Sequence, residues 1–166
     1  MTPTPLTDEA LAHGLQVLSK RDRDLARVID QYGPPPMWAR RPGFPTLIHI
    51  ILEQQVSLAS ARAAFNRLKA AIRVTPRNLL TLDDATLKMI GFSRQKTGYA
   101  RHLAQAILDR RFDPAALANM DDESARAALI ELKGIGVWTA DIYLLITLSV
   151  RLPIKPVIEM SPVSEW

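Results

Sequence analysis

The stretch of the chain best suited to chemistry is a glycine turn between two apolar segments, LKGIGV at residues 132–137. Gly134 and Gly136 permit positive φ and leave the neighbouring peptide groups open to a ligand. Gly136 stands where the next helix is expected to begin, and a helix N-terminus favours an anion. Lys133 adds a positive charge, and we expect Thr139 to help cap the helix. The pattern predicts an anion site suited to a DNA phosphate. The alternative at this point is a tight turn whose glycines serve geometry alone.

Two adjacent amides and two aromatic residues are further candidates for contact with a nucleic acid. Gln54 and Gln55 lie in the middle of an apolar segment, and amides can hydrogen-bond to base edges in the minor groove. The alternative is that both face solvent. Trp138 and Tyr143 follow the glycine turn and are suited to stacking on an electron-poor base. Packing in the core is the alternative for both aromatic residues.

The remaining titratable residues predict no metal site or catalytic dyad. Acidic runs at residues 83–84 and 121–123 fall where helices are expected to start, so capping and dipole pairing explain them. The chain contains no cysteine, and we expect no metal and no cofactor. The histidines have no mutual spacing typical of a zinc site, and we expect surface or packing roles for them: His13, His49 and His102.

Basic residues give the chain a modest positive balance. The formal net charge of the 166 residues is +4, which favours polyanionic partners. Arg94, Lys96 and Arg101 form a positive edge that either contacts phosphates or is simply solvated. The N-terminal residues do not resemble a secretory signal, and no window is long and apolar enough for a membrane helix. We therefore expect a cytoplasmic, nucleoid-associated protein without a membrane partner.

Apolar residues recur at spacings of three and four, which predicts an all-α domain, a compact helical bundle over residues 1–148. A long segment at 47–72, opened by Thr46, becomes two helices if Ser57 caps its second half. Gly91 is expected to end a helix in the left-handed conformation. Residues 74–82 are predicted to form a turn, and 113–120 a short element. About seven helices are expected: 9–20, 22–32, 47–72, 83–91, 93–111, 121–132 and 137–150.

The region 127–148, which contains the segment LKGIGVWTADIYLL, resembles a helix-hairpin-helix motif. Two further stretches agree in order and spacing, LIHIILEQQVSLASARAAFNRL at 47–68 and IGFSRQKTGYARHLAQAI at 90–107. Together they make the chain similar to the helix-hairpin-helix DNA glycosylases, the HhH-GPD superfamily, in its 3-methyladenine glycosylase II branch. The resemblance implies monofunctional base excision from double-stranded DNA, in which the enzyme bends the duplex and flips a damaged base into a pocket.

The resemblance also assigns roles to individual residues. Gln55 falls near the position that inserts into the base stack, and Trp138 and Tyr143 would form the base pocket. The residues expected to bind DNA are Lys133, Gly134, Ile135, Gly136, Val137, Thr139, Gln54 and Gln55.

The catalytic position is where the chain departs from the family pattern. Relatives present an aspartate about two dozen residues beyond the first hairpin glycine, and the same count here reaches Ile158. The nearest carboxylate is Glu159, which we assign as the catalytic residue. The side chain of Glu159 is longer than that of an aspartate, which predicts impaired excision. The proline-rich ending at 149–166 is expected to be an irregular tail of a divergent, truncated or frame-shifted chain, and it points to the same impairment.

Three function classes stay open at the level of sequence. The first is a DNA glycosylase for alkylated bases, active or decayed. The second is a non-catalytic hairpin module that binds DNA phosphates. The third is a helical protein–protein interaction domain. If further helices normally cover Ile142, Leu145 and Leu148, their apolar surface favours a marginally stable monomer or a dimer.

Overall fold

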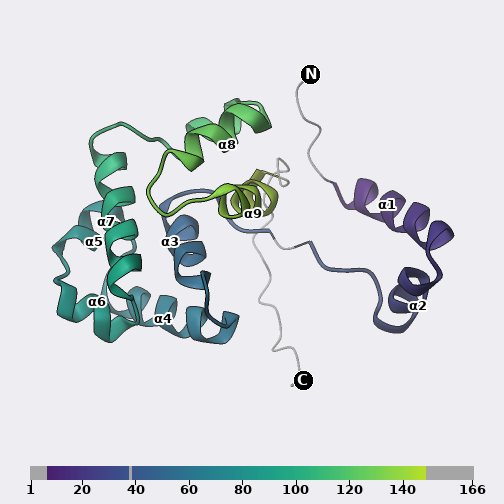
Figure 1. The fold of residues 1–166 in the computed structure, drawn as a ribbon, viewed down its shortest axis with the longest axis horizontal. Coiled ribbons are helices and arrows are strands. Elements are labelled where there is room, and N and C mark those ends of the chain that lie inside the picture. Colours follow the sequence, from purple (N-terminus) through teal and green to yellow (C-terminus); the bar gives the residue numbers. More distant parts are fainter. Residues whose placement is uncertain (1–6, 38, 149–166) are drawn as a thin grey trace. The chain divides into compact units, whose positions relative to one another are not determined.

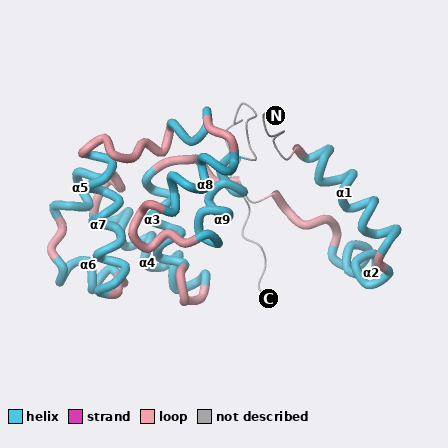
Figure 2. Tube along the Cα trace, turned by 45° about the horizontal axis from the view of Figure 1, so that its top comes forward, coloured by secondary structure: helices cyan, strands magenta, loops and turns pink. Residues whose placement is uncertain are grey.

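The computed structural model describes residues 7–37 and 39–148. These residues form two compact units, 7–37 and 39–148. Figure 2 shows helices and loops, and no strand, in the part of the chain that is described. The all-α class is therefore confirmed, while a single domain over 1–148 stays a prediction.

Nine α-helices and one short 3-10 helix make up the described residues (Figure 1). In chain order they are α1 (Asp8–Arg21), α2 (Arg23–Tyr32), α3 (Phe44–Glu53), α4 (Leu58–Ala71), α5 (Pro76–Thr81), α6 (Asp84–Ile90), α7 (Arg94–Leu108), η1 (Ala116–Asn119), α8 (Asp122–Ile130) and α9 (Val137–Leu148).

The unit 7–37 is a pair of helices with clear start and stop signals. Thr7 caps α1 by accepting a hydrogen bond from the Ala10 N–H at 3.1 Å. The Asp22 carboxylate caps α2, and Gly33, with φ of 78°, ends it. The predicted starts and stops are confirmed. Neither helix contains a buried residue, so within this unit the two helices contact each other without forming a closed core.

The unit 39–148 has a continuous apolar core centred on α3, which packs against α4, α7 and α9. Seven of the ten residues of α3 are buried, because neighbouring helices pack around most of the helix. The remaining outer side carries Pro45, His49 and Glu53. Fully buried residues from five helices meet in this core: Leu47, Ile51, Leu68, Leu87, Leu103 and Leu129.

The long apolar segment is divided as the Ser57 signal predicts. The Ser57 hydroxyl accepts a hydrogen bond from the Ser60 N–H at 3.2 Å and caps α4. The start of α3 differs from the prediction, because the helix already begins at Phe44. The Thr46 side chain donates to the Arg41 carbonyl at 2.6 Å, so its hydroxyl is used by the preceding loop and does not cap the helix.

Residues 74–82, predicted as a turn, contain the helix α5. Thr75 caps it by accepting from the Asn78 N–H at 3.3 Å, and Pro76 occupies its first position, where a missing N–H costs nothing. The other capping predictions are confirmed. Gly91 ends α6 with φ of 117° in the left-handed region, and helices α6, α7 and α8 begin behind Asp83, Ser93 and Asp121.

The last described helix, α9, has one face without cover among residues 39–148. Leu145 is 51% exposed there, and Ile142 is half-buried. The Leu148 side chain and the predicted tail at 149–166 lie outside the described residues. No helix of the described ranges is both long and apolar enough to span a membrane. The oligomeric state stays a prediction.

Candidate functional site

The hairpin turn joins α8 to α9 and is anchored by two apolar side chains. Leu132 and Ile135 are both buried, and the Ile135 N–H donates to the Leu132 carbonyl at 3.0 Å. Gly134 between them has φ of 88°, a conformation that favours glycine. A Cβ at Gly134 would also lie 2.2 Å from Cγ of Tyr99, so the ring of Tyr99 packs directly against the turn. The backbone at Gly134 is therefore held in place by the fold itself.

Gly136 has a different setting from Gly134. A Cβ built on it would meet no atom within 4 Å, and its φ is not positive. Its carbonyl accepts the Ala140 N–H at 2.9 Å, which makes Gly136 the residue that immediately precedes α9. Nothing in the described chain therefore occupies the space beside this glycine.

The N-terminus of α9 is open. The N–H groups of Val137, Trp138 and Thr139 have no acceptor among the residues that the structure describes. By contrast, the other α-helices apart from α3 each begin behind a side chain that accepts a hydrogen bond from a backbone N–H of the first turn. These capping residues are Thr7, Asp22, Ser57, Thr75, Asp83, Ser93 and Asp121. Unpaired N–H groups at the positive end of a helix dipole suit an anion from outside.

Gln54 connects the end of α3 to the hairpin. Its Nε2 donates to the Gly134 carbonyl at 2.9 Å and lies 3.3 Å from Thr139 Oγ1. The expectation that Thr139 caps α9 is wrong, because Thr139 is the third residue of the helix and no backbone N–H of the described residues donates to its hydroxyl. The buried Thr139 hydroxyl accepts from Gln54 instead. Gln54 and Thr139 thus hold the hairpin in position from within the protein.

Gln55 is exposed in the short connection between α3 and α4. Its φ of 57° lies in the left-handed region, which is uncommon for a residue with a side chain. The next apolar side chains, Val56 and Leu58, are exposed too, and Leu58 shows 72% of its surface. The connection and the first residue of α4 therefore present an amide and two apolar groups to solvent.

A cavity of about 300 Å³ lies between this connection and the hairpin. It brings the predicted residues Gln54, Gln55, Gly134, Gly136, Trp138 and Thr139 together with Ser93, Gln95, Lys96 and Tyr99, which the sequence did not assign to this site. Ser93 caps α7, and the other three residues lie in the first half of that helix, so only the tertiary fold places them beside the hairpin. Lys133 is expected beside the phosphate at the start of α9. It instead lines a neighbouring cavity together with residues of α7.

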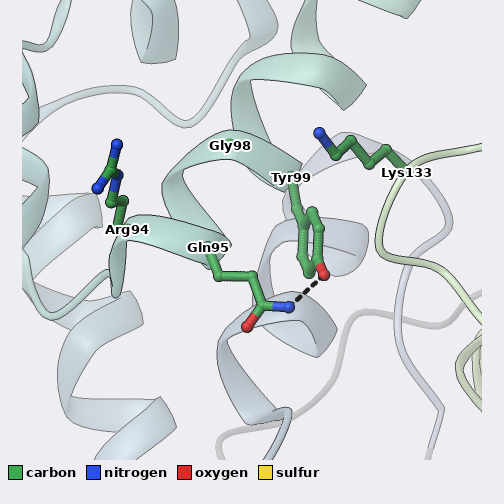
Figure 3. Close-up of a pocket in the computed structure, with 5 residues that line it drawn as sticks. All are labelled: Arg94, Gln95, Gly98, Tyr99 and Lys133. Atoms are coloured by element: carbon green, nitrogen blue, oxygen red, sulfur yellow. Dashed lines mark hydrogen bonds between the residues drawn. The ribbon is translucent and has the colours of Figure 1, made fainter.

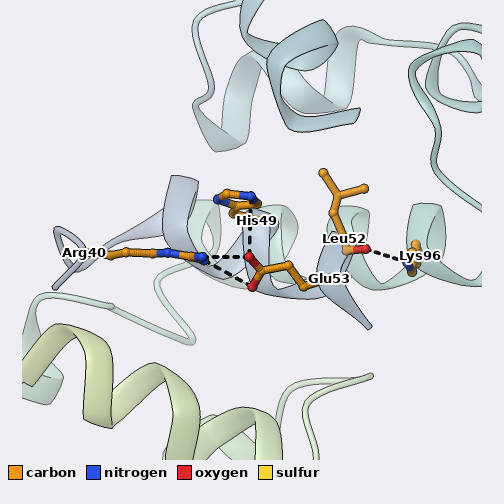
Figure 4. Close-up of polar contacts among 5 residues, drawn as sticks. All are labelled: Arg40, His49, Leu52, Glu53 and Lys96. Atoms are coloured by element: carbon orange, nitrogen blue, oxygen red, sulfur yellow. Dashed lines mark hydrogen bonds and ion pairs between the residues drawn. The ribbon is translucent and has the colours of Figure 1, made fainter. Parts of the chain in front are cut away.

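The expected positive edge of α7 is divided between internal and free side chains. Lys96 Nζ donates to the Leu52 carbonyl at 2.7 Å, near the end of α3 (Figure 4). Burial lowers the pKa of Lys96. Arg101 donates to the Leu82 carbonyl and to the Asp84 carboxylate, at 2.7 and 2.8 Å. Lys96 therefore supports the connection that carries Gln54 and Gln55, since it binds one of the last carbonyls of α3.

The outer side of α3 carries a second polar support. The Arg40 guanidinium donates to both Glu53 oxygens, at 3.2 and 2.7 Å, and His49 Nε2 lies 3.6 Å from the same carboxylate (Figure 4). The His49 ring stacks on Phe65 at 4.3 Å, in agreement with the predicted packing role. Burial lowers the pKa of His49, and the charge of Arg40 lowers it further, whereas Glu53 acts in the opposite direction.

The two candidate pocket aromatics occupy opposite environments. Trp138 is 67% exposed and lines the cavity. Tyr143 is fully buried, and its hydroxyl accepts the Gly43 N–H at 2.9 Å. Burial raises the pKa of Tyr143. Its assignment to a base pocket is therefore corrected, since Tyr143 is a core residue. The sequence held a signal for this, because residues five apart on a helix lie roughly 140° apart around its axis.

The remaining predictions for the site concern chemistry. Glu159 lies outside the described residues. No aspartate or glutamate is among the residues that line the cavity within residues 39–148. The described ranges also contain no group of three or more His, Cys, Asp and Glu side chains able to hold a metal ion.

A family model and a curated relative both match this chain. A family model described as HhH-GPD superfamily base excision DNA repair protein matches residues 48–147. DNA-3-methyladenine glycosylase 1 of Schizosaccharomyces pombe is 25% identical over 140 residues, which cover 81% of this chain and 61% of that protein. The chain thus spans less than two thirds of the length of this relative.

Solved structures of similar fold include two glycosylases. A DNA-3-methyladenine glycosidase of Bacillus halodurans shares 27% identity with a TM-score of 0.64, over 81% of this chain and 63% of that one. The 3-methyladenine DNA glycosylase of Schizosaccharomyces pombe in complex with abasic DNA shares 25% identity with a TM-score of 0.73, over 81% of this chain and 69% of that one.

Proposed function

Because the chain belongs to the HhH-GPD superfamily of base excision DNA repair proteins, we propose that it binds duplex DNA through the hairpin and excises an alkylated base beside it. One observation carries the proposal. The open N-terminus of α9 shares a cavity with exposed Gln55 and Trp138. A phosphate site, a group able to enter the base stack and a stacking surface are therefore neighbours.

DNA binding starts from the phosphate. The N–H groups of Val137, Trp138 and Thr139 point an uncapped helix dipole at the strand, and Gly136 lets the strand approach without meeting a side chain. Such contacts fix the position of the protein on the duplex without reading sequence. The relative solved in complex with abasic DNA supports DNA as the partner.

Base recognition follows beside the phosphate. The left-handed backbone of Gln55 presents its amide from the connection between α3 and α4, where it can replace a base that leaves the stack. Trp138 offers an exposed indole face, and an alkylated purine carries positive charge that is attracted to such a face. The names of the similar glycosylases support the 3-methyladenine class of lesion.

Excision requires hydrolysis of the N-glycosidic bond. Water attacks the sugar carbon as the base leaves with the bonding electrons, and a carboxylate stabilises the oxocarbenium-like transition state. No described residue of the cavity is a carboxylate. The similarity to the family supports a catalytic carboxylate near Glu159, and we assign this role to Glu159. The reaction needs neither a metal nor a cofactor.

The test is a single-turnover assay on duplex DNA that contains 3-methyladenine. We expect the chain to release the base, and Glu159→Gln to reduce the rate by at least about 100-fold, because a neutral amide cannot balance the developing charge. Glu9→Gln, which removes a carboxylate in α1, is the matched control and should leave the rate unchanged. Equal rates for the two variants would exclude Glu159 as the catalytic residue.

A second candidate function is supported by the same lack of a carboxylate among the described cavity residues. In that case the chain is a hairpin module that binds DNA without cutting it. Salt-sensitive binding to duplex DNA together with no release of 3-methyladenine by the unmodified chain would favour this second function over the first.

A further inference from the structure

A second cavity, of about 480 Å³, lies on the α7 side of the hairpin (Figure 3). Arg94 and Gly98 are four residues apart on α7, as are Gln95 and Tyr99, so these residues occupy neighbouring positions on one helical face. Lys133 reaches the same cavity from the hairpin turn. We call these five residues the α7 face.

The α7 face carries two positive charges without an internal partner. Neither Arg94 nor Lys133 makes an ion pair or side-chain hydrogen bond to any residue in the described ranges. On the same helix, Lys96 and Arg101 both use their charges inside the protein. No carboxylate lines the α7 face within residues 39–148, so its charge favours an external anion.

Gly98 provides an independent observation. It lies in the interior of a 15-residue α-helix, where glycine is less stable than alanine. A Cβ at this position would meet no atom within 4 Å, and its φ is not positive. The fold therefore does not require glycine here, whereas a ligand backbone that approaches the helix closely would.

A hydrogen bond stabilises the arrangement of this face. Gln95 Nε2 donates to the Tyr99 hydroxyl at 2.5 Å (Figure 3), and the Tyr99 ring packs against Gly134. The face is thus joined to the hairpin through Tyr99. Gln95 and Tyr99 line both cavities, but none of the residues at the open N-terminus of α9 lines the second one.

We propose that the α7 face is a second phosphate-binding site for the same DNA duplex, distinct from the N-terminus of α9. The proposal rests on the proposed DNA-binding function of the hairpin. Arg94 and Lys133 neutralise a backbone phosphate, and Gly98 allows the adjacent sugar to approach the helix surface. Two separated phosphate contacts fix the orientation of the duplex, which a single contact cannot do.

The test uses the full chain, a fluorescent undamaged duplex and salt from 50 to 200 mM. We expect Gly98→Ala to raise the Tm by about 2 °C and yet weaken DNA binding about 3- to 10-fold, because the added methyl group meets the approaching sugar. Arg94→Gln should lower the salt slope of log K by about 0.9, the value for one lost phosphate contact.

Matched controls separate the face from general effects. Gly14→Ala makes the same change in another helix interior with no atom within 4 Å, and should leave DNA affinity unchanged. Arg77→Gln removes an exposed arginine outside the cavity and should leave the salt slope unchanged. A second set of measurements with Gly136→Asp reports on the hairpin itself.

Each outcome decides between the proposals. If Gly136→Asp abolishes binding while Gly98→Ala and Arg94→Gln bind like their controls, the α7 face is overturned and the hairpin site stands. A lower Tm for Gly98→Ala would also overturn it, because the fold would then need that glycine. An unmodified chain that does not bind the duplex would overturn both proposals.

Discussion

The two glycines of the hairpin are expected to differ sharply in their effect on stability. Gly134 combines a φ of 88° with the ring of Tyr99 against its α-carbon, and a Cβ there would lie 2.2, 2.3 and 2.6 Å from three ring atoms. Gly136 has neither constraint. Replacing each glycine by alanine tests whether Tyr99 and the backbone conformation hold the turn.

The magnitude for Gly134→Ala has two parts. A residue with a side chain in the left-handed region costs about 1–2 kcal/mol, and overpacking costs about 1–3 kcal/mol because the aromatic ring must shift. We therefore expect the free energy of unfolding to fall by about 2–5 kcal/mol. Gly136→Ala should cost less than about 1 kcal/mol, since it only exchanges a residue that precedes a helix.

Urea unfolding followed by far-UV circular dichroism measures both variants. A double variant, Gly134→Ala with Tyr99→Ala, should be more stable than the sum of the two single effects predicts, by about 1 kcal/mol or more, because removal of the ring relieves the overpacking. Equal destabilisation by Gly134→Ala and Gly136→Ala would refute the reasoning, as would strict additivity in the double variant.

Two further predictions concern the supports of α3. Burial and the charge of Arg40 lower the pKa of His49 in the folded chain, so the unfolded chain binds the proton more readily. Protonation of His49 therefore lowers the free energy of unfolding as the pH falls from about 6.5 toward the folded-state pKa. His49→Phe keeps the stacked ring, so urea unfolding at pH 7 and pH 5 should show a smaller decrease than in the unmodified chain, and equal decreases would contradict the assignment. Lys96→Met removes the donor to Leu52 and should cost about 1 kcal/mol and weaken DNA binding, whereas Lys88→Met on the exposed side of α6 should change neither. A Lys96→Met chain that binds DNA with unchanged affinity would show that this support does not position Gln55.

Local signals in the sequence predicted much of the helical framework. Ser57, Asp83 and Ser93 act through hydrogen bonds to residues three positions away, so their roles are visible without knowledge of the fold. The same kind of signal is present at Thr75 and Pro76, which start α5 where only a turn is expected. The prediction that Thr46 opens α3 is wrong because its hydroxyl donates to the carbonyl of Arg41 in the preceding loop.

The site itself was predictable only in part. The spacing of Gly134 and Gly136 indicated an open helix start, but the contact between Gln54 and Gly134 joins residues 80 positions apart. No local pattern in the sequence shows such a contact. Local patterns also do not show that Lys96 donates to a carbonyl of α3, or that Lys133 lines a cavity with α7. Trp138 and Tyr143 differ in burial because the rest of the core selects one face of α9.

The central claim is that the open start of α9 binds a DNA phosphate. The most direct measurement is a titration of ¹⁵N-labelled chain with duplex DNA, followed by amide chemical shifts at low and high salt. We predict that the Val137, Trp138 and Thr139 amides shift most, and that 200 mM salt reverses the shifts, because the contact releases counterions. Binding that leaves these three amides unchanged would contradict the claim.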